Sequence, residues 1–197
     1  MTDSGQVQPD SIAQPLLVHV PEYLSKPRAD ALLAWALRDV HWREERIVLF
    51  GRDVAVPRLV SWYGDAGVGY RYAKLDHWAR GWPSVLGELR DALARDFAVR
   101  CNFVLLNRYR TGSDSMGWHA DDEAMLDGPV VSVSLGSTRR LRLRGGRAGA
   151  TAALTLAHGT LLLHQRHYHH ALPKVSEAVG ERVNLTFRRV LTTGKQR

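Results

Sequence analysis

The sequence lacks the features that would direct the protein into a membrane or an oxidising compartment. It contains one cysteine, Cys101, so no internal disulfide can form, which is typical of proteins from reducing compartments. No apolar stretch approaches the length that spans a bilayer. Residues 1–4 do not begin a basic region followed by an apolar run, so we expect no signal peptide. We therefore expect an intracellular protein, cytoplasmic in a bacterium or nuclear in a eukaryote.

The glycine-rich patterns of nucleotide-cofactor folds are also missing, because neither GxGxxG after a predicted strand nor GxxxxGK occurs. Acidic residues are outnumbered: 27 Lys and Arg stand against 20 Asp and Glu, giving a net charge of +7. A basic surface favours a polyanionic partner, nucleic acid first. An arginine-rich composition without functional meaning remains the alternative explanation.

The 197 residues predict one domain, residues 16–197, after a disordered tail in residues 1–15 that is rich in Gln, Ser, Asp and Pro. Ser25 and Ser84 begin two predicted helices, since apolar residues follow each at helical spacing. From about Phe103 the period changes to two, and several short strands in succession favour a sandwich or jelly roll. We expect strands at residues 16–20, 47–50, 54–56, 103–109, 131–134, 140–144, 151–156, 160–164 and 182–188, a hairpin turn at 51–53, and a loop at 63–67.

A His-x-Asp pair, His119 and Asp121, is the most informative short pattern. If this segment is extended, His119, Asp121 and Glu123 point to one face. A second histidine would complete a 2-His-1-carboxylate set, which leaves positions open for a co-substrate and dioxygen on Fe(II). Four histidines could supply it: His164, His167, His169 and His170. On its own, the pair is a weak signal, because most such pairs are solvated surface residues.

The last predicted strand alternates cleanly, with Val183, Leu185 and Phe187 on one face. The other face is polar, and in an ordinary half-buried sheet it would meet water. In a small jelly roll it would line a cavity instead, where two arginines would suit a dicarboxylate because guanidinium pairs with carboxylate bidentately. The polar residues are Arg182, Asn184, Thr186 and Arg188.

An ordered set of motifs carries a family resemblance. The segments are residues 107–109 (Asn-Arg-Tyr), 116–123 (Met-Gly-Trp-His-Ala-Asp-Asp-Glu), 132–136 (Ser-Val-Ser-Leu-Gly), 170–173 (His-Ala-Leu-Pro) and 182–188 (Arg-Val-Asn-Leu-Thr-Phe-Arg). This set resembles the AlkB family of Fe(II)/2-oxoglutarate dioxygenases, from about residue 45 to the end. Residues 50–51, 56–58 and 63–67 resemble the branch of the family that repairs alkylated double-stranded DNA.

The resemblance implies an α+β fold. A double-stranded β-helix core, jelly-roll or cupin-like, would occupy residues 103–197, and N-terminal helices with a nucleotide-recognition hairpin would occupy residues 16–102. It implies Fe(II) bound by His119, Asp121 and His170, with His169 as the alternative to His170. It implies 2-oxoglutarate bound by Asn107, Tyr109, Arg182, Asn184, Thr186 and Arg188, the last also near the metal. Substrate contacts are implied for Phe50, Gly51, Arg58, Tyr63 and Glu123.

The activity implied is oxidative demethylation of 1-methyladenine and 3-methylcytosine in DNA, with dioxygen consumed and formaldehyde and succinate released. A base in a duplex must be flipped out to reach a buried metal. Single- and double-stranded DNA are the expected partners of a monomeric enzyme. RNA or tRNA demethylation, or hydroxylation of another substrate, are alternatives within the family. A non-catalytic β-barrel with a structural zinc is a further alternative, although it gives the arginines of the last strand no role.

Overall fold

The computed structural model describes residues 17–49, 51–72, 75–144 and 151–191. The predicted tail, Phe50 and the segment 145–150 therefore lie outside the described residues. The elements, in order, are β1 (Leu17–Val20), α1 (Lys26–Asp39), β2 (Arg43–Leu49), β3 (Arg52–Gly64), β4 (Gly69–Tyr72), β5 (Leu75–Trp78), α2 (Ser84–Phe97), β6 (Phe103–Tyr109), β7 (Met116–His119), β8 (Leu126–Gly136), β9 (Arg139–Arg144), β10 (Thr151–Leu156), β11 (Leu161–His164), β12 (His169–Leu172) and β13 (Arg182–Val190).

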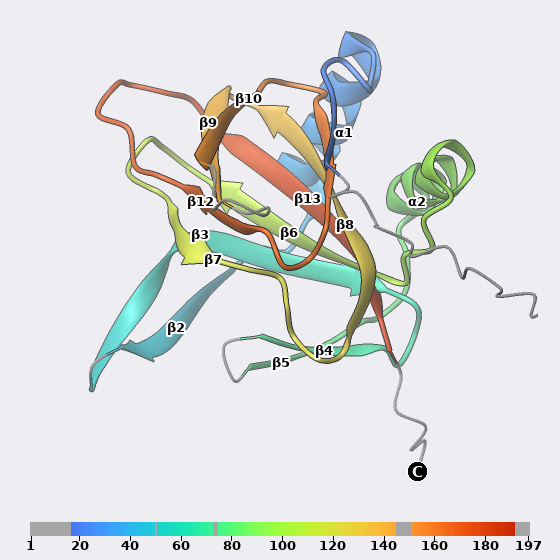
Figure 1. The fold of residues 1–197 in the computed structure, drawn as a ribbon, viewed down its shortest axis with the longest axis horizontal. Coiled ribbons are helices and arrows are strands. Elements are labelled where there is room, and N and C mark those ends of the chain that lie inside the picture. The colour runs from blue at the N-terminus through green and yellow to red at the C-terminus, as the bar shows by residue number, and fades with distance from the viewer. Residues whose placement is uncertain (1–16, 50, 73–74, 145–150, 192–197) are drawn as a thin grey trace, which may run out of the picture.

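Two antiparallel sheets form the core of the fold. The larger has the strand order β1-β11-β8-β13-β6-β3-β2, and the smaller has the order β10-β9-β12-β7. Figure 1 shows α1 and α2 on one side of the large sheet, and the small sheet on the other. This arrangement confirms the predicted α+β fold with a jelly-roll core.

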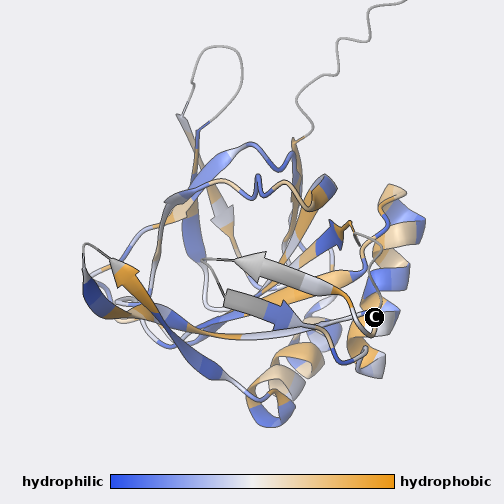
Figure 2. Ribbon diagram, turned by 90° about the horizontal axis from the view of Figure 1, so that it is seen from below, coloured by the Kyte–Doolittle hydropathy of each residue, from blue (hydrophilic) through white to orange (hydrophobic). Residues whose placement is uncertain are grey.

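The two helices pack against the apolar face of the large sheet, at its central strand β13. Val183, Leu185 and Phe187 of β13 pack with Leu86 and Leu89 of α2 in one buried cluster. Figure 2 shows hydrophobic and hydrophilic residues alternating around both helices, as amphipathic helices require. The polar residues of β13 face the small sheet, so the alternation predicted from the sequence is confirmed and its polar face is enclosed.

Both helices begin where the sequence predicts. Ser25 is the N-cap residue of α1, with Pro27 in the first turn, and α2 begins at Ser84. The hairpin strands β2 and β3 are much longer than predicted. Among the described residues, no helix is long and apolar enough to cross a membrane.

The predicted loop at residues 63–67 is partly wrong. Tyr63 and Gly64 still belong to β3, where they pair with Val104 and Phe103 of β6. A side chain at residue 64 would clash, since a Cβ there would lie 2.5 Å from the carbonyl oxygen of Asn102. The glycine therefore permits close strand packing instead of a turn. The short strands β4, β5 and β12 were not predicted.

Candidate metal centre and co-substrate pocket

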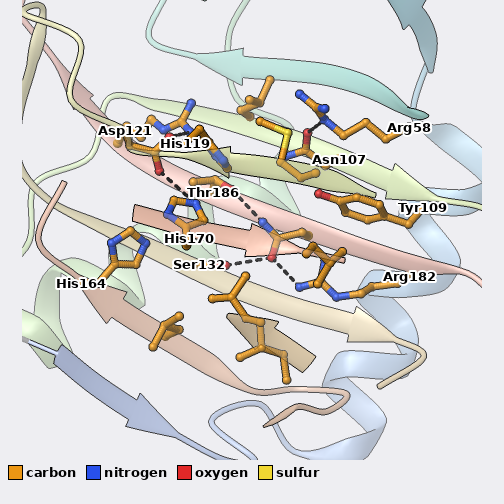
Figure 3. Close-up of a pocket in the computed structure, with 18 residues that line it drawn as sticks. Arg58, Asn107, Tyr109, His119, Asp121, Ser132, His164, His170, Arg182 and Thr186 are labelled. Atoms are coloured by element: carbon orange, nitrogen blue, oxygen red, sulfur yellow. Dashed lines mark hydrogen bonds and ion pairs between the residues drawn. The ribbon is translucent and has the colours of Figure 1, made fainter. Parts of the chain in front are cut away.

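The three residues predicted to bind the metal lie close together at one end of the pocket between the two sheets. His119 ends β7, His170 lies opposite it in β12, and Asp121 follows two residues after β7. One ligand atom from each residue lies within 4.8 Å of the others. His170 Nε2 is 3.9 Å from Asp121 Oδ2. Figure 3 shows the three side chains converging on one end of the pocket.

The backbone fixes which nitrogen each histidine presents. His119 Nδ1 lies 2.9 Å from the carbonyl oxygen of Gly117, and His170 Nδ1 lies 3.1 Å from that of Tyr168. Because a carbonyl only accepts, Nδ1 carries the proton in both rings. Each Nε2 lone pair is then available to a metal, and metal-bound histidines are usually oriented in this way.

The electrostatics give the protonation states that a metal requires. Burial lowers the pKa of His119 to about 4, helped by the neighbouring His170. Burial alone would raise the pKa of Asp121, but Arg188 and the surrounding histidines hold it at about 2. Arg188 Nη2 donates to Asp121 Oδ1 at 2.5 Å. His119 is therefore neutral and Asp121 ionised at neutral pH, and these states fit the 2-His-1-carboxylate site of Fe(II).

Arg182 occupies the other end of the pocket. It is 3% exposed, donates to Ser134 Oγ at 2.9 Å and lies over the ring of Tyr109. No carboxylate pairs with it among the residues that the structure describes. Burial lowers its pKa to about 10, with a further decrease from Arg139. A buried guanidinium without a counter-ion fits an anionic ligand.

The rest of the pocket is lined by hydrogen-bonded polar side chains from strands of the large sheet. Arg58 Nε donates to Asn107 Oδ1 at 2.7 Å, and Asn184 Nδ2 donates to Thr186 Oγ1 at 2.7 Å. The predicted residues Asn107, Tyr109, Arg182, Asn184, Thr186 and Arg188 all line this pocket. Ser132, Met116 and His164 also line it, and Ser134 contacts it indirectly by accepting the hydrogen bond from Arg182. Ser132 and Ser134 alternate with Val131 and Val133 in the sequence, and this alternation could have predicted that the two serines share the polar face of β8.

Other predicted residues are not brought to the pocket. Tyr63 lies on the helix side of the sheet, with its ring centroid 6.2 Å from that of Trp35. Glu123 is not among the lining residues, because β7 ends at His119 and the expected extension to residue 123 does not form. His169 is exposed and pairs with Arg144, which directs it away from the metal site. Gly51 lies at the exposed hairpin turn with φ +76°. Arg58 is the exception among these predicted residues, because it lines the pocket.

Comparisons with known proteins agree with this geometry. Residues 16–188 match the family described as the 2OG-Fe(II) oxygenase superfamily. Human DNA oxidative demethylase ALKBH2 is 38% identical over 164 residues, which cover 76% of this chain and 63% of that protein. Mouse alpha-ketoglutarate-dependent dioxygenase alkB homolog 3 is 31% identical over 190 residues, covering 86% of this chain and 64% of that protein.

The chain thus spans about three fifths of the length of these curated relatives. Among solved structures, OsALKBH1 superposes with a TM-score of 0.64 at 18% identity, covering 89% of this chain and 99% of that one, which shows the shared fold. The family match and the identity to the curated relatives establish that this chain belongs to the AlkB family within the 2OG-Fe(II) oxygenase superfamily.

Proposed function

We propose that this protein is an Fe(II)- and 2-oxoglutarate-dependent dioxygenase that demethylates N-alkylated bases in DNA. The observation that carries the proposal is the His119, Asp121 and His170 set, which shares one pocket with the buried, carboxylate-free Arg182. The names of the relatives, DNA oxidative demethylase among them, support DNA as the substrate. The metal centre supplies oxidation by dioxygen when it is bound.

The chain's own residues bind and orient the reactants. His119, Asp121 and His170 would hold the metal, and Arg188 keeps Asp121 ionised through its 2.5 Å hydrogen bond. Arg182 would pair with the distal carboxylate of 2-oxoglutarate. The enclosing residues Asn107, Tyr109, Asn184 and Thr186 would shape the co-substrate site and exclude water. The substrates we propose are 1-methyladenine and 3-methylcytosine, which would be flipped out of a duplex to reach the pocket.

The proposal is tested by measuring demethylation of both lesions in single-stranded DNA, double-stranded DNA and RNA of the same sequence. Fe(II) and 2-oxoglutarate must be present. We expect methyl groups to be lost from DNA, in both single and double strands. Loss from RNA alone would make the protein an RNA demethylase with the same catalytic residues, and loss from none would contradict the proposed substrate class.

The exposed face of β9 is the surface we propose for phosphate contacts. Arg140 and Arg142 point outward, while Leu141 and Leu143 lie in the core. Arg144, also outward, lies 5.0 Å over the ring of the half-exposed Trp118. The densest run of arginines in the sequence, Arg139, Arg140, Arg142, Arg144 and Arg147, predicts phosphate contacts. Arg139 is buried and donates to the carbonyl oxygens of Asp114 and Pro173, so it is unavailable to DNA.

We expect replacement of both Arg140 and Arg142 by alanine to weaken DNA binding and to lower the slope of log affinity against log salt concentration by about two. Fluorescence anisotropy across a salt series measures this slope. Arg95→Ala on α2 is the matched control, since this arginine is also exposed but lies on a helix. An unchanged slope in the double variant would remove β9 from the DNA surface.

The tip of the β2–β3 hairpin is proposed to fill the gap left by a flipped base. Val48 and Val54 are exposed near the turn at Gly51, so the described part of the tip presents two apolar side chains beside the charged Arg52 and Asp53. Phe50 belongs to this tip in the sequence but lies outside the described residues. Filling the gap offsets lost stacking, which costs a few kcal/mol per step.

We expect Phe50→Ala to reduce repair of duplex DNA far more than repair of single strands, because only the duplex has a stack to restore. The initial rates on the two substrates are compared in one assay, so the single strand serves as the internal control. Residues 145–150 contain one arginine, Arg147, where the branch that repairs double-stranded DNA has a longer basic loop for the complementary strand, and we therefore expect a weaker duplex preference than in that branch. Equal losses on both substrates would mean that Phe50 has no role specific to the duplex.

A further inference from the structure

A third histidine lies in the pocket without a role in the proposed chemistry. His164 ends β11, is 2% exposed and lines the same pocket as the three proposed ligands. Its ring centroid is 5.1 Å from that of His170, compared with 4.1 Å between His119 and His170. Figure 3 shows His164 beside His170 at the metal end of the pocket.

The tautomer of His164 follows from its backbone contact. Its Nδ1 lies 2.9 Å from the carbonyl oxygen of Gln165. Since this oxygen only accepts, Nδ1 is the protonated nitrogen and Nε2 carries a lone pair. His119 and His170 are held in the same way, through their own backbone carbonyls. All three rings are thus fixed as acceptors at Nε2.

His164 nevertheless differs from the two proposed ligands. It is not in the set of residues whose ligand atoms lie within 4.8 Å of one another, so it is not placed as a fourth ligand. Within the described residues, no side chain or backbone group bonds to its Nε2. Among the described residues, Nε2 is not one of the fully enclosed atoms that lack a partner, so its lone pair opens into the pocket that His164 lines and can accept a hydrogen bond from a donor bound there.

The chemistry of an acceptor restricts what can lie beside it. A water molecule can donate a hydrogen bond to Nε2. The carboxylate and keto oxygens of 2-oxoglutarate carry no hydrogen, so they cannot. Next to His164, the pocket is therefore built for water in preference to an oxygen of the co-substrate.

We propose that His164 is a positioning residue that holds a water molecule beside His170, and that 2-oxoglutarate must displace this water when it binds. This inference rests on the proposed function, because it concerns the same pocket. Displacing this water breaks its hydrogen bond to Nε2, so the co-substrate affinity stays below the value that the arginines and the metal alone would give. His164 thus lowers the affinity for 2-oxoglutarate without touching it.

The test uses the full chain loaded with Mn(II), which binds the same kinds of ligand but avoids oxidation during the measurement. We expect His164→Leu to bind 2-oxoglutarate roughly two- to tenfold more tightly than the wild type, since the displaced water has lost its acceptor. His164→Gln keeps an acceptor oxygen and should remain near the wild type. His169→Leu, at an exposed histidine on the neighbouring strand, is the control. Titration calorimetry gives all four dissociation constants.

A crystal structure of the Mn(II)-loaded wild type provides an independent readout, with an ordered water expected within hydrogen-bond distance of Nε2. Absence of this water would overturn the inference even if His164→Leu failed to fold. Equal or weaker binding of 2-oxoglutarate by His164→Leu would also overturn it. Loss of Mn(II) from that variant would make His164 a ligand instead. None of these readouts involves DNA, so failure to demethylate DNA would count against the proposed function alone.

Discussion

Alanine at His119, Asp121 or His170 is expected to abolish turnover and to reduce metal binding severely. A site with three protein ligands has no spare ligand, and each of these residues supplies one donor atom. In Asp121→Ala the loss also leaves Arg188 buried without its carboxylate partner. Metal content after dialysis, measured by atomic emission, separates loss of the metal from loss of chemistry alone.

The control for this prediction is His169→Ala. This histidine is adjacent to His170 in sequence, but it is exposed and lies on the opposite face of β12. We expect it to retain metal and activity. If His169→Ala were inactive and His170→Ala active, the choice of ligand would be wrong by one residue.

Arg182→Ala is expected to weaken 2-oxoglutarate binding by a factor of about 30 or more while the fold stays intact. Leaving one partner of a buried charge pair unpaired costs about 2–5 kcal/mol, and 1.4 kcal/mol corresponds to a factor of ten. The guanidinium is almost fully buried and is held by Ser134 and Asn184, so it is pre-oriented for a bound anion. Titration calorimetry on Mn(II)-loaded protein measures the affinity directly.

Arg140→Ala provides a matched control, because it removes the same charge from an exposed position on β9. Circular dichroism establishes that each variant is folded. Arg182→Lys keeps the charge but loses bidentate pairing, so we expect an intermediate affinity. An unchanged affinity in Arg182→Ala would mean that the co-substrate does not reach this end of the pocket.

Strand alternation was sufficient to predict which residues of β13 share a face. In β13 the polar residues alternate with Val183, Leu185 and Phe187, and the structure places the two sets on opposite faces. The sequence could not decide whether the polar face meets water or a cavity. That depends on the small sheet, whose strand β12 has only four residues and begins with two histidines, so it gives no apolar pattern.

Strand alternation also predicts the positions of two residues that the sequence analysis placed elsewhere, Tyr63 and Arg139. Arg58 and Tyr63 are five residues apart on β3, so they lie on opposite faces and do not share a pocket. Arg139 is two residues from Leu141, and it is buried on the face that carries the leucines of β9. Glu123 lies away from the pocket for another reason. Strand β7 ends at His119, so the alternation does not continue to residue 123, and Asp121 reaches the candidate metal site from irregular backbone.

The central claim is that one pocket couples 2-oxoglutarate to removal of a methyl group from DNA. The most direct measurement is the amount of succinate, formaldehyde and repaired base formed from a 1-methyladenine oligonucleotide with Fe(II), in the wild type and in His170→Ala. We predict equal amounts of all three products in the wild type and none in the variant. Repaired base without succinate, or equal product from His170→Ala, would contradict the account.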